Sequence, residues 1–148
     1  MTDPWNSSQN CYSYAFGHYE ERPYWQQQPG LHSGLYQKGQ KTRFTCPLML
    51  QRTLADNQHD TYVADCHGTC PEGHHKIALA VDPGDPGDYH FFREDPDGSW
   101  SHKVGRGQVY KMTVPPWDSP RYFGRRHYSD FCACMCTKTD GLLGPLTP

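Results

Sequence analysis

The chain has 148 residues, a formal net charge of −2 and a mean hydropathy of −0.88, which fits one domain with a modest core. Acidic and basic residues are interspersed without a basic stripe, so nucleic acid is not an expected partner, and the apolar runs are too short for a membrane span. The first residues lack the pattern of a signal peptide. We therefore expect a cytoplasmic protein as synthesised, with any export by a dedicated route.

Two helices are predicted in the first half of the chain. A short helix is expected over residues 10–21, because Asn10 or Ser8 can cap its first turn and Pro23 would stop it. Residues 22–44 contain several glycines and prolines, which favours a long loop. A second helix is expected over Thr45–Asn57, with its first residue as N-cap and a broad apolar face.

Strands are predicted in the second half of the chain. The apolar run Lys76–Val81 is short and continuous, which is typical of a strand that is buried on both faces. Tyr89–Glu94 and Ser99–Val104 flank an Asp-Pro-Asp-Gly turn sequence, which predicts a β-hairpin. Two further strands are expected over Gln108–Val114 and Tyr128–Cys136.

Together these elements predict an α+β fold, in which an N-terminal helix that carries Cys11 packs on a small antiparallel sheet. The domain is expected to cover residues 1–136. Residues 137–148 contain Gly, Pro and Thr without any period, so we expect them to form a flexible tail.

The seven cysteines indicate a free thiol, since seven is an odd number. Cys11 lies farthest in sequence from the other six, at the expected start of a helix, where the helix dipole and a nearby imidazolium can lower a thiol pKa. His90 and His102 flank the predicted hairpin turn and fall opposite each other if three residues close the loop. This order suits a thiol nucleophile served by an imidazole base and a second, orienting histidine.

The same residues resemble those of the NlpC-type papain-like cysteine peptidases and, more loosely, of the CHAP amidases. The resemblance covers Cys11 and the segments 88–94 and 100–103. It implies a papain-like fold with Cys11 as nucleophile, His90 as base and His102 as orienting group. The implied function is a cysteine hydrolase that cleaves an amide bond in a cell-wall peptide or a host protein. The expected partner is then a peptide or protein substrate, and the catalysis needs no cofactor.

An acyl-transfer site also needs N–H donors near the thiol to stabilise the oxyanion. The backbone N–H of Cys11 is one candidate. The side chain of Gln9 or of Asn10 is a candidate for the second donor.

A Cys- and His-rich loop after the second predicted helix supports an alternative. Four of its residues are close enough in sequence to bind a structural zinc ion in a tetrahedral site. Three cysteines alternate near the end of the last predicted strand, so we expect them to point to one face, toward a metal or disulfide partners. The alternative function is a non-enzymatic binding module stabilised by structural zinc or by disulfides. The candidate zinc ligands are Cys66, Cys70, His74 and His75, and the alternating cysteines are Cys132, Cys134 and Cys136.

Overall fold

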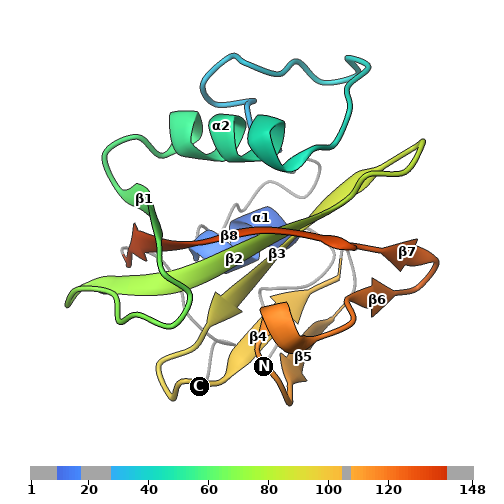
Figure 1. Cartoon of the computed structure of the whole chain (residues 1–148). Helices are drawn as coiled ribbons and strands as arrows, with labels where there is room; N and C mark the ends of the chain where they lie inside the picture. Colours follow the sequence, from blue (N-terminus) through green and yellow to red (C-terminus); the bar gives the residue numbers. More distant parts are fainter. Residues whose placement is uncertain (1–9, 18–27, 105–107, 140–148) are drawn as a thin grey trace.

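The computed structural model describes residues 10–17, 28–104 and 108–139, which form an α+β domain (Figure 1). The helices are α1 (Cys11–Phe16), α2 (Cys46–Asp56) and the short 3-10 helix η1 (Pro116–Asp118). The strands are β1 (Thr61–Ala64), β2 (His74–Asp82), β3 (Asp88–Glu94), β4 (Trp100–Lys103), β5 (Val109–Met112), β6 (Tyr122–Phe123), β7 (Arg126–His127) and β8 (Asp130–Lys138).

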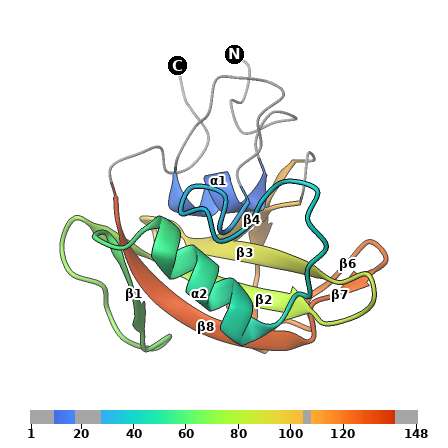
Figure 2. The same ribbon diagram turned by 90° about the horizontal axis from the view of Figure 1, so that it is seen from above.

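Six strands form one antiparallel sheet in the order β1-β8-β2-β3-β4-β5, so the last strand is inserted between the first and the second. Both α-helices lie over the same face of this sheet, which we call the helix face (Figure 2). The η1 turn and the β6–β7 hairpin cover the opposite face, which we call the loop face. In the described ranges, no helix is long and apolar enough to cross a membrane.

The central strand β2 contributes different side chains to the two faces. Ile77, Leu79 and Val81 point to the helix face and belong to its apolar cluster. Ala78 and Ala80 alternate with them and belong to the cluster on the loop face. Every residue of the predicted run is buried, so the prediction of a strand covered on both faces is confirmed.

Both predicted helices form, with Asn10, one of the two predicted candidates, as the N-cap of α1 and with the predicted Thr45 as the N-cap of α2. Oδ1 of Asn10 accepts a hydrogen bond from the backbone N–H of Ser13 at 3.0 Å. Oγ1 of Thr45 accepts one from the backbone N–H of Leu48 at 3.4 Å. These bonds satisfy N–H groups that have no partner inside the helix, which is why helices begin at such residues.

The first helix is shorter than predicted. α1 ends at Phe16, where Gly17 turns the backbone into the left-handed region with a φ of 73°. The N–H of Gly17 then bonds to the carbonyl groups of Ser13 and Tyr14. Residues 18–21 of the predicted helix lie outside the described residues.

The predicted hairpin forms between β3 and β4, but with a different register. Arg93 pairs with Ser101, and the five residues 95–99 close the loop, whereas the prediction assumed three. His102 therefore lies two positions away from the residue opposite His90. Positions that differ by two stay on the same face of the hairpin, so the two side chains still share a face.

The last strand extends beyond the predicted end of the domain. β8 continues to Lys138, and Thr137 pairs with His75 on one side and with Thr61 on the other. The predicted tail was therefore wrong for its first two residues, which belong to the sheet. Residues 140–148 lie outside the described residues.

Six of the seven cysteines form disulfides, and all three bonds end on β8. Cys11 is the free thiol, as the odd count predicted. The prediction that the β8 cysteines share a face was wrong, because a β-bulge opposite Leu79 and Ala80 inserts one extra residue. Cys132 consequently bonds to α2 on the helix face, and the other two bond to the loop before β2. The pairs are Cys46–Cys132, Cys66–Cys134 and Cys70–Cys136.

Candidate functional site

Cys11 begins α1, as predicted, but its side chain lies in the core of the helix face. Only 6% of the residue is exposed, and it packs in one cluster with Tyr12 and Phe91. Burial raises the pKa of the Cys11 thiol to about 12. The thiol is therefore protonated at neutral pH, and a protonated thiol is a poor nucleophile.

His90 and His102 come together on the loop face. Nε2 of His90 lies 2.8 Å from Nδ1 of His102, and the His90 ring packs against Phe123 and Tyr128. Burial lowers the pKa of His102 to about 4. Burial also lowers the pKa of His90 well below its usual value, and the proximity of His102 lowers it further. Both rings are therefore neutral at neutral pH, and one donates a hydrogen bond to the other.

The structure does not bring Cys11 to these two histidines. Neighbouring side chains on a strand point to opposite faces. On β3, Phe91 points to the helix face beneath α1, whereas His90 points to the loop face. The sheet therefore separates the thiol from the imidazole pair, and only the histidine part of the predicted trio is assembled.

One of the two predicted oxyanion donors, Asn10, has a structural role at the start of α1. Gln9 lies outside the described residues. The side-chain oxygen of Asn10 accepts the helix-capping bond from Ser13, so this side chain serves the start of α1. The N-cap function thus explains the presence of an asparagine before Cys11.

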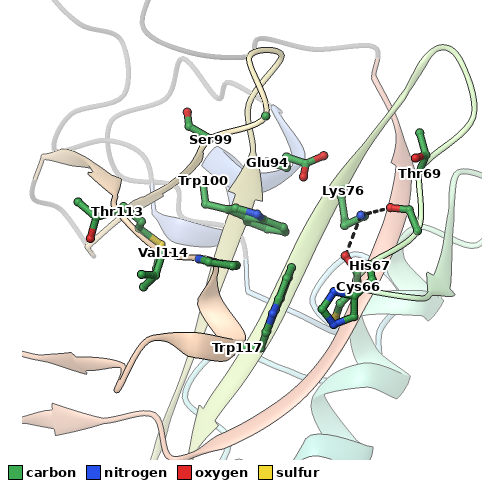
Figure 3. Close-up of a pocket in the computed structure, with 14 residues that line it drawn as sticks. Cys66, His67, Thr69, Lys76, Glu94, Ser99, Trp100, Thr113, Val114 and Trp117 are labelled. Carbon is green, nitrogen blue, oxygen red and sulfur yellow. Dashed lines mark hydrogen bonds between the residues drawn. The ribbon is translucent and has the colours of Figure 1, made fainter.

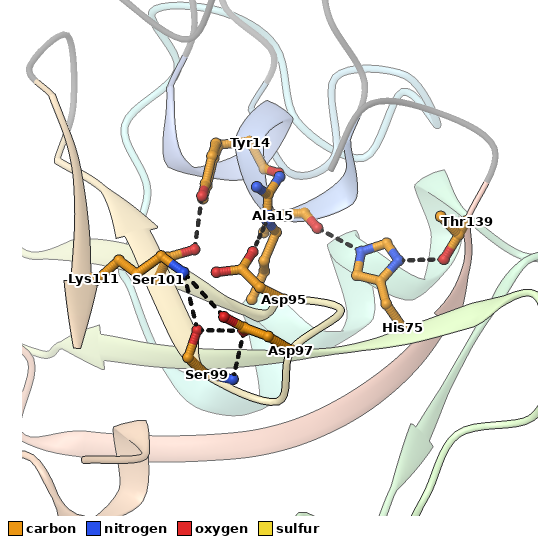
Figure 4. Close-up of polar contacts among 10 residues, drawn as sticks. Tyr14, Ala15, His75, Asp95, Asp97, Ser99, Ser101, Lys111 and Thr139 are labelled. Atoms are coloured by element: carbon orange, nitrogen blue, oxygen red, sulfur yellow. Dashed lines mark hydrogen bonds and ion pairs between the residues drawn. The ribbon is translucent and has the colours of Figure 1, made fainter. Parts of the chain in front are cut away.

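Polar side chains fasten α1 to the sheet (Figure 4). Arg93 is fully buried and donates to the carboxylate of Asp95 at 2.8 Å and to the carbonyl of Tyr14 at 3.0 Å. Its guanidinium carbon lies 3.7 Å from the centroid of the Tyr14 ring, and the Tyr14 hydroxyl bonds to Ser101 at 2.7 Å. Cys11, the first residue of α1, is therefore buried at a tightly hydrogen-bonded interface between this helix and the sheet.

The predicted zinc site is wrong, because its sulfur atoms are used elsewhere. Cys66 and Cys70 are bonded to Cys134 and Cys136 in disulfides, and a disulfide sulfur is not the thiolate ligand that zinc binds. No other cluster of three or more candidate metal ligands occurs among the residues that the structure describes.

The two histidines of the predicted zinc site have local structural roles. Nε2 of His75 lies 2.8 Å from the carbonyl oxygen of Ala15, and its Nδ1 lies 2.7 Å from the hydroxyl of Thr139 (Figure 4). Nδ1 of His74 lies 3.2 Å from the carbonyl oxygen of Glu72. His75 therefore joins α1 to the end of the sheet.

The loop face carries an open groove of about 470 Å³ (Figure 3). Trp100 from β4 and Trp117 from η1 meet there at an angle of 86°, with ring centroids 5.6 Å apart. The loop before β2 forms the other wall, where His67 packs against Trp117 at 5.1 Å. We call this the tryptophan groove. It is lined by the segments 66–69, 98–100 and 112–115 and by Trp117, Lys76 and Glu94.

Two side chains of opposite charge lie next to each other in the tryptophan groove. Because Ile77 pairs with Arg93, their neighbours Lys76 and Glu94 are adjacent on the loop face. Lys76 is 4% exposed and donates to the carbonyl groups of the Cys66–Gly68 turn. Among the described residues, the carboxylate of Glu94 makes no hydrogen bond and no ion pair. The groove therefore offers a fixed cationic donor beside an unoccupied anionic acceptor.

The tryptophan groove was not predicted from the sequence. Its residues come from the loop before β2, from β2, from the β3–β4 hairpin and from the segment 112–117. Only the sheet and the disulfides bring these four parts of the chain together. One signal was present in the chain. Ala78 and Ala80 in an otherwise large-residue strand mark a face with room for aromatic side chains from elsewhere.

Comparisons with known proteins give one partial match. No protein-family model and no solved structure matches the chain. The chain is 47% identical over 57 residues to a protein named insoluble matrix shell protein 1 from Ruditapes philippinarum. The match covers 37% of this chain and 37% of that protein, so it spans little more than a third of either. The papain-like resemblance stays a prediction from sequence.

Proposed function

We propose that this protein is a non-enzymatic binding module, stabilised by disulfides, whose ligand-binding surface is the tryptophan groove. The observation that carries the proposal is the convergence of the three disulfides on β8. Two of them, Cys66–Cys134 and Cys70–Cys136, hold the loop that forms one wall of the groove. A wall fixed by covalent bonds lowers the ordering entropy that a ligand must offset when it binds.

The geometry around Cys11 supports binding in preference to hydrolysis. Its thiol is protonated and enclosed by the aromatic residues of the helix face. The candidate base His90 lies on the other face of β3 and bonds to His102. A nucleophile and its base act together only within hydrogen-bond reach. The hydrolase stays a prediction, which thiol reactivity tests directly.

The disulfides and the partial match also support an extracellular location in place of the expected cytoplasmic one. Structural disulfides persist in oxidising compartments and are rare in the cytosol. The partial relative is named as a shell matrix protein. We therefore place the proposed module in a secreted, matrix-like setting.

The test is the rate at which iodoacetamide labels each cysteine of the native, non-reduced protein at pH 7.5, followed by mass spectrometry. We expect six cysteines to resist labelling and Cys11 to react at least about tenfold more slowly than in the unfolded chain, because burial holds the thiol in its protonated form. The His90→Ala variant should label at the same rate as the wild type.

The control is the same reaction in denaturant, where Cys11 is exposed and only the disulfides protect the remaining sulfurs. Fast labelling of native Cys11 that slows in His90→Ala would overturn the proposal and favour the cysteine hydrolase. Free thiols at Cys66 or Cys70 in the purified native protein would remove the observation on which the proposal stands.

A further inference from the structure

We infer, on the basis of the proposed binding function, that the tryptophan groove binds a neutral polysaccharide, with one sugar ring against Trp117 and its hydroxyl groups between Lys76 and Glu94. Three features of the groove support this ligand class. They are the arrangement of the indole rings, the pairing of a donor with an acceptor, and the open, hydroxyl-bearing rim.

The two indole rings provide a rigid apolar surface. Trp100 is only 5% exposed and forms the floor, while the half-buried Trp117 forms a wall at right angles to it. Trp117 is held between His67 at 5.1 Å and Phe131 at 6.4 Å. A large flat ring fixed by its neighbours binds a complementary flat face at little entropic cost. The carbon-bound hydrogens on one face of a sugar ring form such a surface.

The charged pair selects a group that both donates and accepts hydrogen bonds. An ammonium has three donors, and Lys76 directs its ammonium to the carbonyl groups of Cys66 and Gly68 without a carboxylate partner among the described residues. Glu94 can only accept. A hydroxyl group donates and accepts, so neighbouring hydroxyls on one sugar can satisfy both side chains.

The same pair disfavours ligands with a net charge. A sulfate or carboxylate placed near Lys76 would lie beside the carboxylate of Glu94, and a lysine or arginine placed near Glu94 would lie beside the ammonium of Lys76. Like charges at such short range weaken binding. A neutral chain avoids both penalties, and this is the reason for assigning a neutral polysaccharide over an acidic or basic peptide.

The rim of the groove also suits a long hydroxylated chain. Thr69, Ser99 and Thr113 lie on the three segments that border it, and Figure 3 shows them spaced around the two indole rings. Small hydroxyl side chains donate and accept in the same way as sugar hydroxyls. Because the groove is open to the surface, the rest of a bound chain can lie in solvent outside it.

The test is titration of the full-length native protein with two neutral β-1,4-linked oligosaccharides, cellohexaose and the hexamer of N-acetylglucosamine. Binding is followed by tryptophan fluorescence and by NMR shifts of the Trp117 indole and the Lys76 and Glu94 side chains. We expect saturable binding of at least one hexamer, with shifts concentrated on these three residues.

Variants then test each contact. Trp117→Ala should weaken binding at least about tenfold, Lys76→Met about tenfold, and Glu94→Gln by a smaller factor, because glutamine keeps one acceptor oxygen. Trp117→Phe should retain part of the affinity, since a flat ring remains. Tyr62→Ala is the matched control, because Tyr62 is an aromatic residue on β1 that is 46% exposed and is not part of the groove lining. It should bind as the wild type does.

The absence of saturable binding of either hexamer at millimolar concentration would overturn the inference, and so would binding that Trp117→Ala leaves unchanged. The NMR mapping on the unaltered protein keeps the test decisive if a variant fails to fold. Shifts of the same side chains with oligolysine or oligoglutamate, but not with sugars, would sink the polysaccharide assignment and leave the binding module standing. Fast, His90-dependent labelling of Cys11 would instead remove the binding-module proposal itself.

Discussion

The helix face and the loop face of the same sheet are stabilised by different means. On the helix face, Ile77, Leu79, Val81 and Phe91 are fully buried beneath two helices, so burial of apolar area dominates. On the loop face, the small residues Ala78 and Ala80 leave space that aromatic rings and two disulfides fill. The well-packed face therefore encloses Cys11, whereas the face held by two disulfides carries the groove.

Removal of a disulfide, tested once on each face, has the largest expected effect on the free energy of unfolding. The Cys46→Ser/Cys132→Ser and Cys66→Ser/Cys134→Ser double variants open loops with sequence separations of 86 and 68 residues. The two disulfides that remain in each variant still link the same segments, and the link is much shorter around Cys66–Cys134 because Cys70–Cys136 lies beside it. In the chain-entropy account, loss of Cys46–Cys132 therefore costs about 3.5 kcal/mol of unfolding free energy and loss of Cys66–Cys134 about 2 kcal/mol, as measured by urea denaturation.

The two double variants should differ in the groove itself. Loss of Cys66–Cys134 removes one of the two disulfides that hold a groove wall, so Trp117 should become more accessible to acrylamide quenching, whereas loss of Cys46–Cys132 on the other face should leave this accessibility unchanged. Equal quenching in both variants would show that the loop wall does not depend on its disulfide. The wild-type protein reduced with dithiothreitol serves as the fully released reference.

The elements of the fold were predictable from sequence because their signals are local. The N-caps Asn10 and Thr45, the apolar run of β2 and the turn between β3 and β4 each act within a few residues. The short strands β1, β6 and β7 were not predicted, since two to four residues carry too little pattern.

The faces of the strands were not predictable in the same way. In the segment Tyr89-His90-Phe91-Phe92, aromatic residues occupy both parities, so the pattern does not show which residues meet α1. Only the packing reveals that Phe91 faces Cys11 and that His90 does not. A shift of one residue along β3 would exchange the faces of His90 and Phe91. The histidine would then lie on the same face as Cys11 and not across the sheet from it.

The disulfide pairing could not be predicted from the sequence either, because six cysteines allow fifteen connectivities. The bulge in β8 is a further non-local feature, since it arises where the strand bends against Leu79 and Ala80. Without it Cys132 would share a face with Cys134, and the bond to α2 could not form.

The buried histidine pair predicts an acid sensitivity specific to the loop face. The pKa of His102 is lowered to about 4 and that of His90 is also lowered, so below about pH 6.5 the unfolded chain binds protons that the folded chain does not. The contribution of the two neutral histidines to the free energy of unfolding is therefore fully present above about pH 6.5 and is lost as the pH drops toward 4. His102 alone accounts for about 3 kcal/mol of this loss.

This acid sensitivity is measured as the urea midpoint between pH 7.5 and pH 4. The His90→Gln/His102→Gln variant should show a flatter pH dependence than the wild type, because glutamine keeps a hydrogen-bonding side chain and does not titrate there. His59→Gln, at an exposed histidine, is the matched control and should follow the wild-type curve. A double variant with the wild-type pH dependence would contradict the neutral, buried pair.

The smallest predicted effect compares the two N-caps on the helix face. Asn10 is 6% exposed and its bond to Ser13 is 3.0 Å long, whereas Thr45 is exposed and its bond to Leu48 is 3.4 Å long. Asn10→Ala should therefore cost about 1 to 2 kcal/mol and Thr45→Ala about 0.5 kcal/mol. The six residues of α1 cannot form a stable helix alone, so its cap matters more.

The two caps should also differ in their effect on the free thiol. Because the Asn10 cap helps to hold α1, and with it Cys11, against the sheet, Asn10→Ala should speed native Cys11 alkylation, and Thr45→Ala should not. Equal alkylation rates in the two variants would mean that the packing of α1, and not its cap, controls access to the thiol.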